Sequence, residues 1–247
     1  MTDFSQLQIL HEDEHLIAVN KPAGLRVIPD GYRKDLPDLH HLLSKTYGRL
    51  WVVHRLDRET SGAILFARTA ESHKLLNQQF QNREVNKVYH LLAIGSPLHS
   101  EIKIDYPLQI NGDRAHRTII DFKNGKAAST LVRPIERFTN HINLLEALPK
   151  TGYTHQIRAH LAAAGYWLLN DTLYFPYDQP PEQPNAHPAL PAEYRTLCQK
   201  LPIHRIALHC LHIQFLHPYH KQLFSITAPY PADFLQTLEL LQKEGGD

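Results

Sequence analysis

Cysteine is scarce in this sequence, because its 247 residues include only Cys198 and Cys210. Two cysteines are too few for a disulfide scaffold, and both stand among apolar residues, where buried free thiols are common. No run approaches the roughly 18 apolar residues that a membrane-spanning helix needs, and the N-terminus lacks the basic and apolar segments of a secretory signal. We therefore expect a cytoplasmic protein with no membrane partner.

An excess of charge of either sign is also missing, since 26 Lys and Arg residues face 25 Asp and Glu residues, for a net charge of +1. The average hides two unlike parts: residues 231–247 carry a local charge of −3, which leaves +4 for the first 230 residues. The balance therefore excludes only an RNA partner held by a uniformly basic surface. Phosphate contacts should be few and local, so any RNA affinity should depend weakly on salt.

Short alternating or β-branched runs dominate the sequence and predict strands. Many strands with few intervening helices favour an α+β fold with a largely antiparallel mixed sheet, flanking helices and a central cleft. No linker is evident, so we expect a single domain over residues 1–247. The predicted strands are residues 16–19, 50–53, 63–66, 87–94, 118–120, 142–145 and 211–215; the predicted helices are residues 70–83, 154–164 and 232–243.

The densest group of polar residues runs from His54 to Gly62, between two predicted strands. Here Asp57 lies between Arg55 and Arg58, and nearby cations keep an Asp ionised. An ionised, positioned Asp can serve as a nucleophile or base. The alternative is structural: Asp57 caps a turn formed by residues 58–62, whose Thr, Ser and Gly are typical turn residues.

Two further segments carry candidate functional residues. If Thr154 opens the predicted helix, His155 and Arg158 face the same way and can present a cation to a carboxylate. The alternative is a solvated polar face on an amphipathic helix. Tyr89 lies on the predicted strand 87–94, where a lone aromatic residue is usually part of the core.

These segments, in this order, resemble motifs of the RluA-type pseudouridine synthases. Residues 54–62 are similar to the family's HRLDxxTSG signature, residues 87–89 to its tyrosine motif and residues 151–161 to its TGRTHQIRxHL motif. Residues 19–25 resemble the family's entry motif, and residues 208–218 its closing LHAxxLxFxHP strand. The resemblance extends from about His11 to Pro229, nearly the whole chain.

The resemblance implies an RNA-modifying enzyme that converts uridine to pseudouridine and needs no cofactor or metal. It implies that Asp57 is the essential nucleophile, that Arg158 pairs with it, and that Tyr89 stacks on the uracil and can relay the C5 proton. The target base must leave its stack, at a cost of a few kcal/mol. The substrate-binding residues implied or suggested by the motifs are Arg55, Ile157, His54, Arg58, Tyr153 and His155.

Some positions depart from the family pattern. Tyr153 stands where the motif usually has Arg, which exchanges a charge for stacking or hydrogen bonding. Asn170, before Asp171, stands where a Gly is usual, and Asn tolerates the left-handed conformation. Tyr166 and Trp167 make the same corner bulkier. Because the chain begins close to the entry motif, we expect no N-terminal S4-type RNA-binding domain, and we expect a monomer that holds RNA through its catalytic domain.

Single-stranded loops with splayed bases are the usual targets of proteins that read RNA sequence. We favour tRNA over large-subunit rRNA as the substrate, and residues 109–125 and the proline-rich residues 176–191 as candidate RNA contacts. The alternative function is a catalytically silent RNA-binding protein or RNA chaperone. We expect no metal site, because His209 and His212 would point to opposite faces of a strand.

Overall fold

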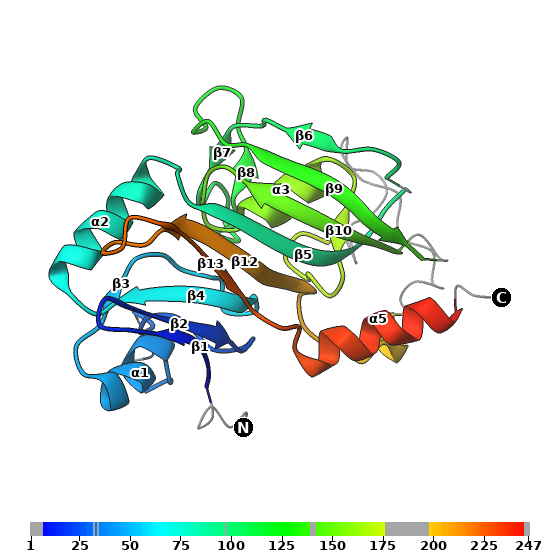
Figure 1. The fold of residues 1–247 in the computed structure, drawn as a ribbon. Helices are drawn as coiled ribbons and strands as arrows, with labels where there is room; N and C mark the ends of the chain where they lie inside the picture. Colours follow the sequence, from blue (N-terminus) through cyan, green and yellow to red (C-terminus); the bar gives the residue numbers. More distant parts are fainter. Residues whose placement is uncertain are drawn as a thin grey trace. The chain divides into compact units, whose positions relative to one another are not determined.

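The computed structural model describes residues 7–31, 33, 35–96, 98–138, 142–175 and 198–244, so the proline-rich residues 176–191 lie outside the described part. Contacts divide the chain into two compact units. The N-terminal unit comprises residues 1–89 and 209–231, and the central unit comprises residues 90–208 and 232–247. The predicted α+β class and the mostly antiparallel pairing are confirmed (Figure 1). Within the described residues, every helix is too short or too polar to cross a membrane.

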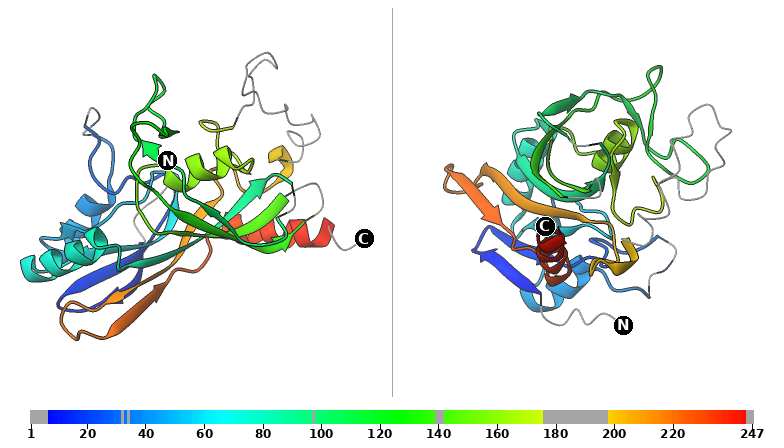
Figure 2. Two further views of the ribbon diagram at one scale, coloured as in Figure 1. Left: turned by 90° about the horizontal axis from the view of Figure 1, so that it is seen from above. Right: turned by 90° about the vertical axis from the view of Figure 1, so that its right-hand side faces the viewer.

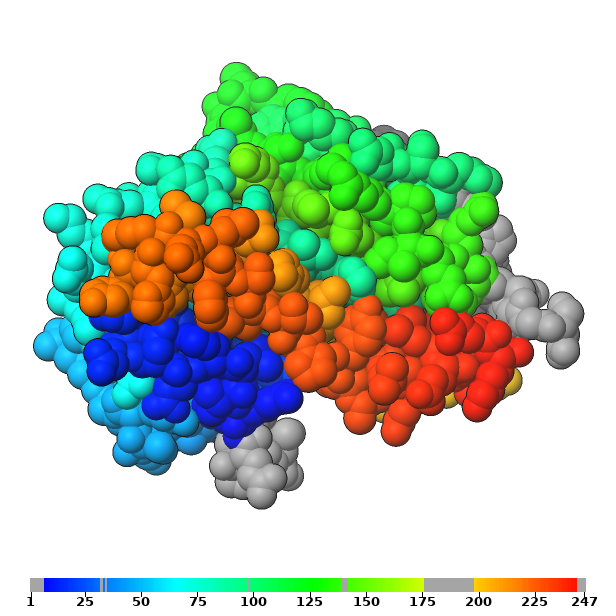
Figure 3. Space-filling model, in the orientation of Figure 1, coloured from blue at the N-terminus to red at the C-terminus, as the bar shows by residue number. Residues whose placement is uncertain are grey.

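The N-terminal unit contains a sheet in which β1, β2, β4 and β12 lie in that order. β2 and β4 pair antiparallel, whereas β4 and β12 pair parallel, and all seven residues of β4 are buried. Figure 3 shows the β12–β13 hairpin in orange beside β1 and β2 in dark blue. The strands are β1 (Gln8–Glu12), β2 (Leu16–Lys21), β3 (Trp51–Val52), β4 (Ser61–Ala67), β12 (Leu208–Leu216) and β13 (Leu223–Thr227).

Two capped helices accompany this sheet. Helix α1 (Leu39–Tyr47) begins where the Asp38 carboxylate accepts the backbone N–H of His41 at 2.9 Å. Helix α2 (Ala70–Gln81) begins at Thr69 in the same way and ends two residues before the predicted end at Arg83. Arg83 has a φ of 61°, a left-handed conformation that cannot continue a helix.

The central unit contains a second run of strands, in the order β5, β10, β9 and β6, with β11 paired to β5. β5 begins in the N-terminal unit and continues into the central unit. Figure 2 shows the curved strands of this unit around helix α3. Its elements are β5 (Asn86–Ile94), β6 (Ile102–Ile104), the β7–β8 hairpin (Leu108–Gln109, Ile119–Ile120), β9 (Thr130–Arg137), β10 (Ile142–Pro149), α3 (Gln156–Ala163), β11 (Trp167–Leu168) and α5 (Ala232–Glu244).

The predicted helix start at Thr154 is wrong. Helix α3 begins at Gln156, after His155, whose φ of 56° is left-handed. The carbonyl of Thr154 instead accepts the Thr118 hydroxyl at 2.7 Å, so a contact with the β7–β8 hairpin replaces the expected cap. Asn170 has the left-handed conformation predicted for it, with a φ of 60°.

Candidate active site

Asp57 lies in the loop of residues 53–60 that joins β3 to β4. The loop makes a tight turn in which the Asp57 carbonyl accepts the backbone N–H of Thr60 at 3.1 Å. Asp57 is half-buried, whereas Arg55 and Arg58 are exposed. Arg58 forms a surface ion pair with Glu59 at 3.0 Å. A turn closed by the backbone carbonyl of Asp57 is therefore present, and arginines exposed to solvent lie on both sides of Asp57.

Lys21, at the end of β2, holds this loop from inside. Its side chain is fully buried, and its ammonium group donates to the carbonyls of Pro22, Leu25 and Arg58 at 2.9, 2.7 and 3.0 Å. A second contact is the hydrogen bond from the Gly24 N–H to the Arg58 carbonyl, at 2.9 Å. The entry motif thus fixes the backbone next to Asp57, a role for Lys21 that the sequence alone does not indicate.

The other end of the loop is anchored where β4 meets β12. The Ser61 hydroxyl donates to Nδ1 of His209 at 2.9 Å, and Nε2 of His209 donates to the Ala228 carbonyl at 3.1 Å. Gly62 has a φ of 117°, and a Cβ there would lie 2.2 Å from the Cys210 carbonyl oxygen. Only glycine allows this backbone approach, which explains the last residue of the TSG motif.

Tyr89 belongs to the same unit as Asp57 and is buried. Burial raises the pKa of Tyr89 well above its usual range; Cys210, with which its side chain is hydrogen-bonded, and the charge of Asp57 raise it further. Burial also raises the pKa of the Cys210 thiol, to about 12. Tyr89 is therefore a neutral phenol within electrostatic range of Asp57, and Cys210 is an inert buried thiol.

His54 has a role inside the unit. Its Nε2 accepts the backbone N–H of Leu65 at 3.0 Å, and its ring stacks on Phe80 with centroids 4.7 Å apart. Burial, and next the positive charge of Lys87, lower the pKa of His54 from 6.5 to about 3. A neutral imidazole adds no charge against phosphate, so the structure supports His54 as a residue that positions the loop.

This depressed pKa predicts acid sensitivity. Because the folded pKa of His54 is lower than 6.5, protonation favours unfolding: its contribution to stability is complete above pH 6.5 and is lost as pH falls toward 3. The loss should be about 1.4 kcal/mol per pH unit in that window. In His54→Gln, whose amide oxygen can still accept the Leu65 N–H, urea unfolding at mildly acidic and neutral pH should show a pH slope smaller by about one proton. An unchanged slope would contradict the assignment.

Arg158, in the central unit, is buried and paired. Its Nε and Nη2 donate to the two carboxylate oxygens of Asp171, both at 2.7 Å, and its guanidinium lies 4.9 Å from the centre of the Tyr174 ring. The Tyr174 hydroxyl accepts the Thr118 N–H at 2.8 Å and donates to the Thr118 carbonyl at 3.0 Å. His155 joins the group through Nδ1, which lies 3.4 Å from the Tyr174 hydroxyl. His155 and Arg158 thus meet through Tyr174, and helical spacing does not relate them.

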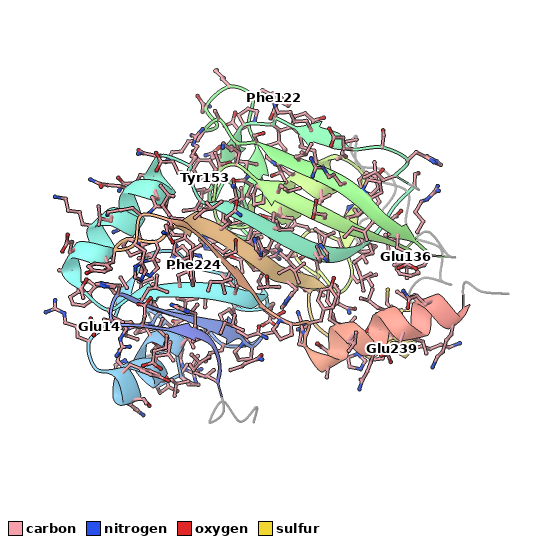
Figure 4. The ribbon with its side chains drawn as sticks, viewed as in Figure 1. Glu14, Phe122, Glu136, Tyr153, Phe224 and Glu239 are labelled. Atoms are coloured by element: carbon pink, nitrogen blue, oxygen red, sulfur yellow. The ribbon has the colours of Figure 1, made fainter. Side chains whose placement is uncertain are left out.

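The remaining polar residues of this motif face inward, so the solvated-face interpretation is wrong. The Gln156 amide accepts from Thr151 at 2.7 Å and donates to the Ser129 carbonyl at 3.0 Å. Ile157 is buried. Tyr153, labelled in Figure 4, packs against the buried side chains of Leu108, Ala128 and Ala159. This packing accounts for an aromatic residue at the position where the family usually has arginine.

The pairing of Arg158 with Asp171 predicts a large effect on stability. Asp171→Ala leaves a buried guanidinium without its carboxylate and should lower the free energy of unfolding by about 3–5 kcal/mol. A matched control is Asp233→Ala, which breaks the more exposed bidentate pair of Arg205 and Asp233, at 2.7 and 3.1 Å, in the same unit. It should cost about 1–2 kcal/mol. Equal losses in urea denaturation would refute the special burial of the Arg158 pair.

The structure therefore assembles two partial sites from the predicted residues. Asp57 and Tyr89 come together in the N-terminal unit, while Arg158, His155 and Ile157 are organised around α3 in the central unit. The motifs assign no supporting role to Lys21, His209, Asp171 or Tyr174, and the structure gives each of them one. A buried arginine requires a carboxylate partner, so the position of Asp171 shortly after α3 could have indicated its pairing with Arg158. We find no comparable sequence signal for Tyr174.

One group of potential metal ligands gathers among the described residues: His11, Asp13 and His217. Nε2 of His11 and Nε2 of His217 both lie within hydrogen-bond distance of the same Asp13 oxygen, at 2.9 and 2.8 Å. Nδ1 of His217 accepts backbone N–H groups from Tyr219 and His220 at 3.3 and 3.2 Å. Its proton therefore sits on Nε2, the atom that would have to bind an ion, whereas metal-binding histidines donate from their other nitrogen. The group suits internal hydrogen bonding.

Comparisons with known proteins agree with this fold and these motifs. A family model described as RNA pseudouridylate synthase matches residues 15–163. The ribosomal large subunit pseudouridine synthase D of Pseudomonas aeruginosa is 35 % identical over 246 residues, covering 97 % of this chain and 73 % of the relative. The dual-specificity RNA pseudouridine synthase RluA of Pasteurella multocida is 31 % identical, covering 90 % of this chain and 93 % of the relative.

Solved structures show the same fold. Human RNA pseudouridylate synthase domain containing 4 superposes with a TM-score of 0.73 at 23 % identity, covering 95 % of this chain and 93 % of that chain. Human RNA pseudouridylate synthase domain containing 1 gives a TM-score of 0.72 at 22 % identity, covering 94 % and 86 %. The chain belongs to the RNA pseudouridylate synthase family, a family of isomerases. Within it, the relatives confirm the RluA-type resemblance of the sequence.

Proposed function

We propose that this pseudouridine synthase isomerises a flipped-out uridine of a structured RNA, with Asp57 as its nucleophile. The observation that carries the proposal is the double anchoring of the Asp57 loop, by Lys21 on one side and by Ser61 with His209 on the other. A catalytic carboxylate needs such a fixed backbone, because a misplacement of about 1 Å can cost 10²-fold in rate.

The reaction leaves the composition of the uridine unchanged, although its C5 hydrogen is exchanged with water. The bond from ribose C1′ to N1 breaks, the uracil turns within the site, and a bond from C1′ to C5 forms. C5 gives up its proton and N1 ends with one, so the base needs neither an oxidant nor a reductant. As the nucleophile, the Asp57 carboxylate forms a bond either to ribose C1′, as the bond from C1′ to N1 breaks, or to the uracil ring. That bond breaks again before the product leaves, so the carboxylate is regenerated.

Tyr89 is proposed to stack on the uracil. Because the pKa of Tyr89 is raised well above its usual range, the phenol is protonated at neutral pH. It can therefore accept the C5 proton only by passing its own proton on in the same step, which makes it a relay and not a phenolate base.

Arg158 is proposed to be the cationic partner of Asp57. Its bidentate bond to Asp171 and its contact with Tyr174 hold the guanidinium plane in one orientation. A guanidinium held in one plane can give a second carboxylate directed hydrogen bonds. We further propose that the exposed Arg55 contacts the flipped nucleotide and that Arg58 contacts the RNA backbone.

The RNA target is proposed to be a loop of tRNA, with large-subunit rRNA as the second candidate. The relatives' names include both large-subunit enzymes and a dual-specificity enzyme, so the two candidates need a direct test. Pseudouridine mapping in total RNA from cells with and without this gene should show at least one tRNA site that depends on the gene. A site lost only in rRNA would overturn the tRNA proposal, and the loss of no site in any RNA would overturn the function.

A further inference from the structure

Phe122 is the most exposed large apolar side chain in the described part of the chain, at 76 %. It lies in the turn after β8, within the segment 109–125 that the sequence singled out, and Figure 4 labels it. Its ring meets the edge of Tyr106, which is 37 % exposed, with centroids 5.7 Å apart. Two neighbouring aromatic rings thus face solvent in the central unit.

The turn that carries Phe122 is built rigidly. The Asp121 carboxylate accepts the backbone N–H groups of Lys123 and Asn124, both at 2.9 Å, and the Asp121 carbonyl accepts the Gly125 N–H at 2.9 Å. A Cβ at Gly125 would lie 2.4 Å from that carbonyl oxygen, so the tight turn requires glycine. The backbone of Phe122 is therefore already ordered, which lowers the entropic cost of binding a ligand there.

The segments next to the β7–β8 hairpin also contact the part of the chain that carries Arg158. The carbonyl of Tyr106 accepts Nε2–H of His160 at 2.9 Å, and His160 lies on α3 two residues after Arg158. On the other strand of the hairpin, Thr118 bonds to the Thr154 carbonyl and to Tyr174. Phe122 and Arg158 are thus attached to one rigid part of the central unit.

Cations predominate around the aromatic pair. Residues 103–126 carry five cationic side chains and three carboxylates. The three carboxylates already have partners: Asp105 pairs with Lys103 at 2.7 Å, Asp113 pairs with Arg117 at 2.6 Å, and Asp121 caps its own turn. Arg114, Lys123 and Lys126 are exposed. Exposed aromatic rings among cations are typical of surfaces that bind single-stranded nucleic acid, because bases stack on the rings while cations meet phosphates.

We propose that Tyr106, Phe122, Lys123 and Lys126 form a stacking platform for an unpaired base of the substrate RNA, separate from the flipped uridine. This inference rests on the proposed function, since the ligand is the RNA that contains the target. It adds a substrate requirement: the RNA needs a second unpaired nucleotide beside its target, so fully paired RNA binds without using the platform.

The test compares Phe122→Ala with Phe122→Trp and with the matched control Ile135→Ala, which truncates an apolar side chain of the same unit that is 46 % exposed. The probes are a synthetic RNA stem-loop and a fully paired duplex of the same stem, and the readout is fluorescence anisotropy. Phe122→Ala should weaken stem-loop binding about tenfold and change duplex binding less than about twofold. Phe122→Trp and Ile135→Ala should bind both probes as the wild type does.

Three results would overturn the platform: unchanged stem-loop binding in Phe122→Ala, equal weakening with both probes, or a wild-type dimer in sedimentation that Phe122→Ala dissociates. The last would make this surface a contact between two copies of the chain. The proposed function fails separately, when the wild type forms no pseudouridine in any RNA. If the wild type formed no pseudouridine but Phe122→Ala weakened only stem-loop binding, the stacking platform would still be supported as an RNA-binding surface.

Discussion

Asp57→Asn should abolish pseudouridine formation, with an expected loss of at least about 10⁴-fold in the single-turnover rate. The substitution keeps the size of the side chain and removes its charge, so the loop can keep its anchors at Lys21 and Ser61. RNA affinity should stay within a few-fold of wild type, because the arginines beside Asp57 are intact. The measurement is the rate on purified substrate RNA together with the dissociation constant for the same RNA.

Glu59→Gln is the matched control for this prediction. Glu59 is a carboxylate two residues along the same loop and pairs with Arg58 at the surface at 3.0 Å. Exposed ion pairs contribute about 0–1 kcal/mol, so this variant should keep its rate within a few-fold. If Asp57→Asn kept a tenth of the wild-type rate, Asp57 would not be the nucleophile. If Glu59→Gln lost as much activity as Asp57→Asn, the loss would not be specific to the Asp57 carboxylate.

Gly62→Ala should be the most damaging change outside the reacting groups. The new methyl would meet the Cys210 carbonyl oxygen at 2.2 Å, and a φ of 117° is strained for any residue with a Cβ. The clash cannot be relieved by a side-chain movement, because the contact is with backbone. We expect a loss of about 4 kcal/mol in the free energy of unfolding, from strain and overpacking together, and a large loss of activity as β4 separates from β12.

Gly48→Ala separates the clash from the backbone conformation. Gly48 caps α1 with a φ of 71°, and a Cβ there would have no atom within 4 Å. It should cost about 1–2 kcal/mol and leave the rate unchanged. If urea unfolding gave the two glycine variants equal losses, the approach of β4 to β12 would not be the reason for Gly62.

The strongly patterned elements could be predicted from the sequence. β4 is a run of small and apolar residues with every member buried, and α5 follows Pro231 with leucines at helical spacing. Helix α1 was missed because its sequence LHHLLSKTY is short and carries two histidines; Asp38 and Gly48 define it by capping. Asp before and Gly after a helix are signals that a sequence can carry, so these two residues could have indicated α1.

Strand β9 was missed for a different reason. Pro134 interrupts its pattern, and proline is rare inside strands because it cannot donate to the ladder. The register with β10 shifts here, from Leu144 paired with Glu136 to Leu145 paired with Pro134, so the proline lies at a β-bulge. The strand therefore tolerates Pro134.

Only those residues of the site that belong to recognisable motifs could be predicted from the sequence. The motif around Asp57 and the tyrosine motif identified residues that the structure brings within electrostatic range. The supports of Lys21 and Tyr174 were not predictable, because both are polar residues that bond to backbone atoms of other segments. The left-handed conformation of His155 next to the contact of Thr154 with Thr118, 36 residues away in sequence, is not encoded in the local helical spacing.

RNA labelled with tritium at C5 of uridine tests directly whether this chain isomerises uridine through Asp57. Pseudouridine formation replaces the bond from C5 to hydrogen by a bond from C5 to C1′, so each turnover must release one tritium to water. The wild-type protein should release tritium in step with the pseudouridine formed, and Asp57→Asn should release none. Pseudouridine formation without tritium release, or equal release by Asp57→Asn, would contradict the central claim that this chain isomerises uridine through Asp57.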